Sequence, residues 1–200
     1  MEFLAKKLTV TTILLCLVVT ACVTLGGQEV VTRSKEKAPD WASRNEGKLY
    51  GENSNIQFLA IKKKQNDLAL GIKSTQLAAL DGSRKAMNIK VYSELESLAS
   101  NEKIILSNVT ELDTAVRNVV QKKHAEYARV NDIYFEQIKD VDQEENVRDF
   151  YDIFVLVNLN QSSLVDIYQD LSAQLRGSNL PDLRQLGAAI KPDNIPQLSH

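Results

Sequence analysis

A charge-free run of apolar and small residues, from Leu8 to Ala21, restricts the fold of this chain more than any other feature of its sequence. As a helix the run would reach roughly 21 Å, well short of the ~30 Å hydrocarbon core of a bilayer. Lys6 and Lys7 precede it, and Cys22 follows it directly. A positive segment, a short apolar segment and small residues before a cut are typical of a secretory signal peptide. We therefore predict that residues 1–21 are removed and contribute nothing to the folded domain.

The run ends in Val19-Thr20-Ala21-Cys22, which resembles the bacterial lipobox of an aliphatic residue, two small residues and a cysteine. This motif predicts cleavage between Ala21 and Cys22, followed by attachment of diacylglycerol and fatty acids such as palmitate to the cysteine. Several acyl chains, each contributing about 0.8 kcal/mol per buried CH₂, bind a membrane far more firmly than one. The alternative is an uncleaved membrane anchor in which Cys22 has no role.

Cysteine usage agrees with a role in attachment. Cys16 lies inside the predicted signal peptide, so the mature chain keeps only Cys22 and has neither a disulfide framework nor a second thiol to act as a nucleophile. Val23, rather than aspartate, follows the cysteine. The sorting rule of enteric bacteria then predicts the outer membrane, with the domain facing the periplasm and exposure at the cell surface as the alternative.

The composition permits one compact domain, because 44% of the 200 residues are hydrophobic and 25% are charged. Residues 22–38 are mostly small or polar and are predicted to form the lipidated cysteine and a flexible tether. Residues 39–176 are the predicted domain, in which Trp41 is expected to cover one edge of the core. Residues 177–200 contain Pro181, Pro192 and Pro196 and are predicted to be a C-terminal extension without a long regular element.

Hydrophobic periodicity predicts the elements of the domain. Strands are expected at 49–61 with Gly51 at a turn or bulge, at 89–95, at 129–139 and at 150–159; the last is apolar on both faces and therefore central. Helices are expected from 66 to 87, from Asn108, and from Ser163, where Asp166 completes a capping box and Gly177 ends the helix. Its buried stripe comprises Leu164, Ile167, Leu171 and Leu175. The order β-α-β-α-β-β-α predicts a single small α+β domain with helices packed on a mixed or antiparallel sheet.

No catalytic, cofactor or metal site can be assembled from the sequence. The two histidines, His124 and His200, lack ligand spacing, and no phosphate loop, nucleophile elbow or zinc motif occurs. We interpret His124 as a surface or hydrogen-bonded polar residue. The acidic group in the predicted connection 140–146 lacks the glycine and the twelfth-position glutamate of a calcium loop, and reads as a solvated turn. Its members are Asp140, Asp142, Glu144 and Glu145.

The charge pattern excludes an obvious nucleic-acid site. The formal net charge is −2, and the only basic run is Lys62-Lys63-Lys64, which reads as solvated surface. The chain is therefore predicted not to be an enzyme and not to bind nucleic acid. The predicted organisation, with a lipid anchor, a tether, one domain and a tail, is typical of an interaction or structural protein.

Four stretches in order behind the lipobox resemble the Lpp-twenty family, named for a twenty-kilodalton membrane-associated bacterial lipoprotein. The match covers residues 38–176, in these stretches: Ala38-Pro39-Asp40-Trp41 leading to Leu49-Tyr50-Gly51; the helix Asn66 to Met87 running into Ile89-Lys90-Val91; Tyr127 to Glu136; and Tyr151 to Val157, followed by a helix. The chain departs from the family where Glu52-Asn53 replaces the usual second glycine of the opening strand. A polar insertion also precedes the first helix.

The resemblance implies no catalytic residues, because the family has none to carry over. FlgP-type relatives assemble into rings or disks around the flagellar motor under the outer membrane, which implies a self-assembling ring component with Cys22 as anchor. An exposed edge strand or the proline-containing tail would then join neighbouring copies. Two other hypotheses stay open: a general envelope lipoprotein that binds another envelope protein, and a domain that binds a small ligand in a deep apolar pocket.

Overall fold

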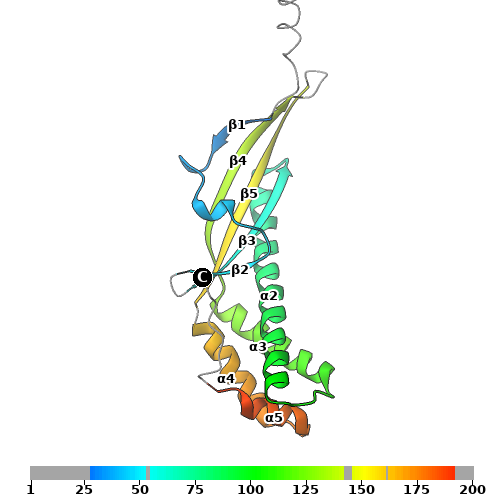
Figure 1. Cartoon of the computed structure of the whole chain (residues 1–200). Coiled ribbons are helices and arrows are strands. Elements are labelled where there is room, and N and C mark those ends of the chain that lie inside the picture. The colour runs from blue at the N-terminus through cyan, green and yellow to red at the C-terminus, as the bar shows by residue number, and fades with distance from the viewer. Residues whose placement is uncertain (1–27, 53–54, 142–145, 161, 192–200) are drawn as a thin grey trace, which may run out of the picture.

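The computed structural model describes residues 28–52, 55–141, 146–160 and 162–191. Within these ranges the chain forms four α-helices and a five-stranded antiparallel sheet, which confirms the predicted α+β class. The body is elongated, with the sheet at one end, three helices at the other, and one long helix running along both (Figure 1). The bounds are β1 Gln28–Arg33, η1 Asp40–Ser43, β2 Leu49–Glu52, β3 Asn55–Gln65, α2 Leu68–Asn101, α3 Val109–Tyr127, β4 Arg129–Val141, β5 Val147–Asn160, α4 Ser162–Arg176 and α5 Pro181–Ala189.

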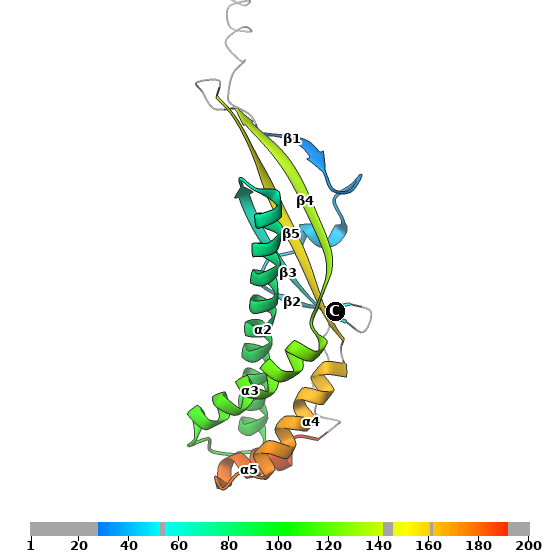
Figure 2. The ribbon, with the colours of Figure 1, turned by 180° about the vertical axis from the view of Figure 1, so that it is seen from behind.

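The sheet has the strand order β1-β4-β5-β3-β2, so the predicted central strand is indeed central. In β5, alternate residues such as Ile153, Val155 and Val157 face α2, while Leu156 faces the opposite side and is also buried. Both faces of β5 are therefore covered, which explains why apolar residues do not alternate with polar ones in its sequence. This pattern predicted a central strand. The β4–β5 hairpin extends beyond the start of α2 (Figure 2).

The long helix α2 covers one face of the sheet with small side chains. Asp67 begins the helix, because its carboxylate accepts a hydrogen bond from the backbone N–H of Leu70 at 2.9 Å. An added Cβ at Gly71 would lie 2.4 Å from Ile153 Cδ1, and one at Gly82 would lie 2.7 Å from the Phe58 ring. Glycine at these two positions therefore lets the helix approach β3 and β5 closely.

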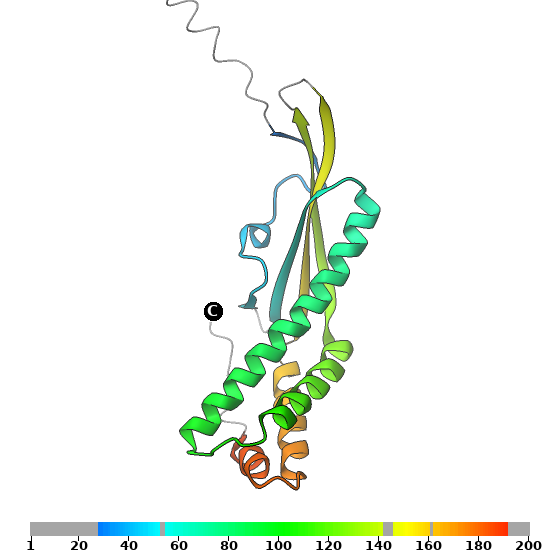
Figure 3. The same ribbon diagram turned by 90° about the vertical axis from the view of Figure 1, so that its right-hand side faces the viewer.

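The second face of the sheet is covered by the segment that joins β1 to β2. These strands lie at opposite edges, so residues 34–48 must cross the sheet, and they do so on the side away from α2 (Figure 3). Trp41 lies on this segment, over the face rather than in the main core. The side chains buried on this face are Leu59, Tyr134, Ile138, Phe150 and Leu156.

At the other end of the body, α3, α4 and α5 pack around the second half of α2. The predicted stripe of α4 is buried, and α5 adds Leu183 and Leu186 to the same core. The carboxylate of Asp182 accepts hydrogen bonds from the backbone of Ser107 and from the backbone and side chain of Asn108, at 2.9–3.0 Å. These bonds fix the loop between α2 and α3 to the start of α5.

Four predictions about the first half of the chain are wrong. Residues 28–33 are not tether but strand β1, paired with β4. The strand predicted at 49–61 is the hairpin β2–β3, with Gly51 inside the ladder opposite Ile56. The strand predicted at 89–95 is part of α2, which ends at Asn101 rather than near Met87. Ile89 is 71% exposed, because the buried positions recur every fourth residue, at Met87, Val91, Leu95 and Ala99.

Two predictions about the second half also fail. The capping box is absent: Ser163 lies inside α4 and donates its hydroxyl to the carbonyl of Asn160 at 2.5 Å, while Asp166 accepts from the Tyr127 hydroxyl at 2.7 Å. The predicted extension 177–200 contains α5, so the domain continues past residue 176. The predicted start of a helix at Asn108 and the predicted end of the last helix before Gly177 are confirmed. Residues 192–200 lie outside the described ranges.

Replacing Gly82 by alanine tests the close approach of α2 to the sheet. Alanine favours a helix by about 1 kcal/mol over glycine, but its methyl group would overlap the buried Phe58 ring, which commonly costs ~1–3 kcal/mol. We expect Gly82→Ala to lower the free energy of unfolding measured by urea denaturation. Ser97→Ala, at an exposed position of the same helix, is the control and should change it by less than about 0.5 kcal/mol. A Gly82→Ala variant more stable than wild type would contradict the close packing.

Candidate functional site

The predicted processing residues Ala21 and Cys22 lie outside the described residues, but the structure shows where the chain that follows them joins the fold. Gln28 begins β1 opposite Asp140 of β4, and the β4–β5 ladder ends one residue further on, at Val141 opposite Val147. The polypeptide therefore enters the domain at the end of the sheet that lies furthest from α3, α4 and α5 (Figure 1).

We call this part of the surface the hairpin end and define it as residues 28–31, 138–141 and 147–150. Its opposite charges lie across from one another, with Lys139 opposite Asp149 and Asp140 opposite Arg148. It also carries exposed aliphatic side chains, namely Val30 (36% exposed), Val31 (53%) and Val147 (53%). The described residues of the hairpin end are thus mixed in character, and the connection between its two long strands, which lies outside the described residues, adds Asp142, Glu144 and Glu145 to the sequence.

The two edge strands of the sheet are offset along the strand direction. Through the ladders, β1 is level with residues 148–152 of β5, whereas β2 is level with residues 157–160. At ~3.3 Å per residue this offset is roughly 28 Å. A β-bulge at Val31 further interrupts the outer edge of β1.

One carboxylate joins two points of the crossing segment to the sheet, and further hydrogen bonds join the two ends of the segment to the sheet. Asp132 of β4 accepts hydrogen bonds from Lys35 Nζ at 2.5 Å and from Trp41 Nε1 at 3.2 Å, and its other oxygen accepts from the backbone of Ile133. Burial opposes ionisation of Asp132, but these bonds together outweigh it and lower the pKa of the carboxyl. Asp132 therefore joins the start and the middle of the segment to the same strand.

Removing this carboxylate should loosen the segment. We expect Asp132→Ala to speed amide hydrogen exchange over residues 34–48 and to lower the free energy of unfolding by about 1–2 kcal/mol, because charge-assisted hydrogen bonds are lost. Asp149→Ala removes an exposed carboxylate from the neighbouring strand and serves as the control. Unchanged exchange over 34–48 in Asp132→Ala would show that other contacts hold the segment.

His124 is buried between α3 and α2 and has a hydrogen-bond partner. Its Nε2 is hydrogen-bonded to the Ser83 hydroxyl, 2.8 Å away, and the same hydroxyl oxygen lies 3.0 Å from the carbonyl oxygen of Leu80. Burial lowers the pKa of His124, Arg84 lowers it further, and Asp81 acts in the opposite direction. The described residues contain no group of three histidine, cysteine or acidic side chains placed to hold a metal. His200, Asp142, Glu144 and Glu145 lie outside them.

This histidine should make the stability of the domain depend on pH. Because its pKa is lower in the folded than in the unfolded state, the unfolded chain takes up a proton first as the pH falls below about 6.5. We expect the free energy of unfolding to fall between pH 7.5 and pH 5.5, and His124→Gln to flatten this dependence. His200→Gln, which removes the other histidine, should keep the wild-type slope. Equal slopes in wild type and His124→Gln would contradict this assignment.

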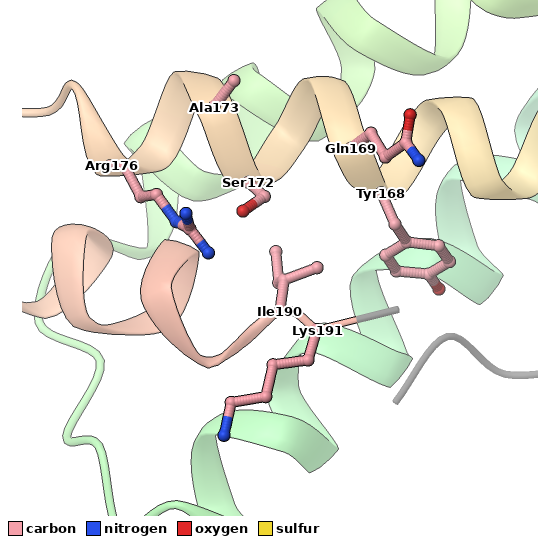
Figure 4. A pocket seen from close by; sticks show the side chains of 7 residues that line it. All are labelled: Tyr168, Gln169, Ser172, Ala173, Arg176, Ile190 and Lys191. Atoms are coloured by element: carbon pink, nitrogen blue, oxygen red, sulfur yellow. The ribbon is translucent and has the colours of Figure 1, made fainter. Parts of the chain in front are cut away.

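A pocket between α4 and the residues after α5 has a volume of about 240 Å³ and is lined by Tyr168, Gln169, Ser172, Ala173, Arg176, Ile190 and Lys191 (Figure 4). Ser172 and Arg176 both donate hydrogen bonds to the carbonyl of Gly187, at 2.8 and 3.0 Å. Tyr168 donates to the Glu94 carboxylate of α2. The pocket is smaller than typical small-molecule sites of 300–1,000 Å³, and these polar groups already serve the packing of α5 and α2.

The sequence contained signals for the two elements that it failed to predict. Val30-Val31-Thr32 is a β-branched run between Gly27 and Ser34, which is typical of a strand. Pro181 stands at the first position of a helix, with apolar residues at Leu183 and Leu186.

None of the described helices is both long and apolar enough to cross a membrane.

Comparisons with known proteins found no matching family model, no similar curated protein and no similar solved structure.

Proposed function

We propose that this chain is a lipoprotein of the bacterial envelope, anchored through an acylated Cys22, whose domain has a structural or interaction role. The observation that carries the proposal is the order of Lys6-Lys7, the charge-free run and Val19-Thr20-Ala21-Cys22. The fold supports it, because the first strand begins at Gln28, soon after Cys22 in the sequence, and lies at one end of the elongated domain. The expected location of the protein is the outer membrane, with the domain in the periplasm.

The arrangement of polar groups supports a role in interaction rather than catalysis. His124 is engaged with Ser83, Asp132 with Lys35 and Trp41, and Asp182 with the α2–α3 loop. Each of these groups joins two elements of the fold. We therefore propose that the domain presents surfaces to other molecules and performs no reaction.

The resemblance to the Lpp-twenty family adds the more specific candidate, a self-assembling component near the flagellar motor. Its third stretch lies mostly on β4 and its fourth stretch lies on the neighbouring strand β5. Its second stretch fits less well, since Ile89-Lys90-Val91 lies within α2. A general envelope lipoprotein that binds a different protein is the second candidate.

The offset between the edge strands restricts how copies could assemble. β1 and β2 run parallel, so copies standing the same way up could pair β1 with β2 of the next copy. Each such step would displace the next copy by roughly 28 Å along the strands, which gives a climbing row rather than a closed ring. A planar ring of anchored copies could therefore not be built by pairing β1 with β2 of the next copy.

Complementation of a deletion strain tests both parts of the proposal. We expect Cys22→Ala to lose membrane association, measured by fractionation after carbonate extraction, because no acyl chains are attached. Cys16→Ala is the matched control, since this cysteine leaves with the signal peptide, and should remain in the membrane fraction. A Cys22→Ala chain that stays with the membrane would contradict the anchor.

The same strains separate the two candidate roles. If the chain serves the flagellar motor, deletion abolishes swimming in soft agar, and wild type and Cys16→Ala restore it whereas Cys22→Ala does not. Normal swimming of the deletion strain would reject the flagellar candidate. The general envelope role would then be the one to pursue, by crosslinking in cells.

A further inference from the structure

We propose that the domain stands upright on its membrane, with the hairpin end facing the lipid headgroups and the α2–α3 loop pointing away from them. This inference rests on the proposed anchoring at Cys22. It assigns the lipid surface as the neighbour of the hairpin end and leaves the helical end as the surface that reaches a distant partner.

The length of chain before β1 limits how far the hairpin end can be from the anchor. Residues 23–27 separate Cys22 from Gln28, and a fully extended chain spans at most ~3.6 Å per residue. The start of β1 therefore lies within roughly 20 Å of the acylated cysteine. Because Gln28 pairs with Asp140, one residue from the end of the β4–β5 ladder, the hairpin end is held within the same distance.

When the long axis of the body points away from the membrane, the α2–α3 loop lies much further from Cys22 than the roughly 20 Å that limits the hairpin end. Helix α2 has 34 residues and is about 51 Å long. It starts at Leu68, just after Gln65 pairs with Tyr151, whereas the hairpin end lies at residues 147–150 of β5, beyond that level. The α2–α3 loop thus lies more than about 50 Å from the hairpin end.

The exposed side of α2 lacks the continuous apolar stripe that would hold the body flat on a bilayer. Leu70, Leu77 and Ile89 are exposed, but at 100° per residue Ile89 lies about 120° around the helix from Leu77. Charged residues, Lys73 and Lys85, lie among them. An interfacial helix needs a single apolar face, so α2 is poorly suited to lie in the headgroup region.

The hairpin end is better suited to face headgroups. Its exposed aliphatic side chains at Val30, Val31 and Val147 are accompanied by the cross-strand pairs Lys139 with Asp149 and Asp140 with Arg148. A zwitterionic surface has no net charge, so it neither strongly attracts nor strongly repels these groups or the acidic residues of the connection 142–145. The short connection to the anchor, rather than charge attraction, then determines the orientation.

Energy transfer from two single labels tests the orientation in the full-length lipidated chain. Val147→Cys places a thiol at the hairpin end and Ser100→Cys places one at the end of α2, both at exposed positions. The mature protein has no other free thiol, because Cys22 is acylated, so each variant takes one fluorophore. The probe is phosphatidylcholine vesicles carrying an energy acceptor on a fraction of the headgroups.

We expect several-fold more efficient transfer from the Val147→Cys label than from the Ser100→Cys label. Insertion of a twelve-residue glycine–serine segment between Gly27 and Gln28 should reduce transfer at Val147→Cys, because the hairpin end is then free to move away. Equal transfer from both labels would mean that the body lies flat, and stronger transfer from Ser100→Cys would mean that it is inverted; either result would overturn the proposal.

Failure of the anchor itself would be seen separately. Two results would contradict the proposed lipidation: wild-type protein that does not float with the vesicles, or a Cys22→Ala variant that floats as well as the wild type. Protein that floats only when Cys22 is present, but transfers energy equally from both labels, contradicts the upright orientation alone.

Discussion

The close packing of α2 against the sheet is the contact on which the rest of the structure depends. The first half of the helix lies on β3 and β5 through glycine, alanine and threonine, with Gly71 against Ile153 and Gly82 against Phe58. The second half supplies Met87, Val91, Leu95 and Ala99 to the core shared with α3, α4 and α5. Because a single helix takes part in both layers, the sheet and the helical end are held as one elongated body. A larger side chain at either glycine would have to displace a buried neighbour that belongs to the central strands.

This construction gives the two ends of the molecule different surroundings. The N-terminal strand joins the sheet at the hairpin end, while the α2–α3 loop and α5, joined by Asp182, form the opposite end. An anchor next to the first end makes the length of α2 the distance over which the protein can act. The offset of the strand edges has a second consequence, because pairing of β1 with β2 of the next copy would not close a ring of copies that share one membrane.

The sequence predicted best those elements whose signal is local and repeated. The stripe Leu164, Ile167, Leu171 and Leu175 recurs at helical spacing, and the apolar run of β5 has no polar face, so both were predicted correctly. The prediction of a strand at 89–95 was wrong, because Ile89 and Val91 alternate with polar residues over a few positions only. The four-residue period from Met87 to Ala99, which indicates a helix, is visible only over a longer window. Strand β1 was not predicted, because its β-branched run is short and its partner β4 lies about a hundred residues away, as the ion pair between Arg33 and Glu136 illustrates. The candidate site divides in the same way: the motif at Cys22 is read directly from the sequence, but the end of the fold to which it is joined is known only from the strand register.

The proposed anchor at Cys22 determines the orientation of the domain, and the intact mass of the native protein purified from cell membranes measures the state of this cysteine directly. We expect a mass that lacks residues 1–21 and carries the increment of a diacylglycerol group, with or without a further acyl chain. A mass that includes residues 1–21 without a lipid would contradict the anchor, and with it the assignment of the hairpin end to the membrane.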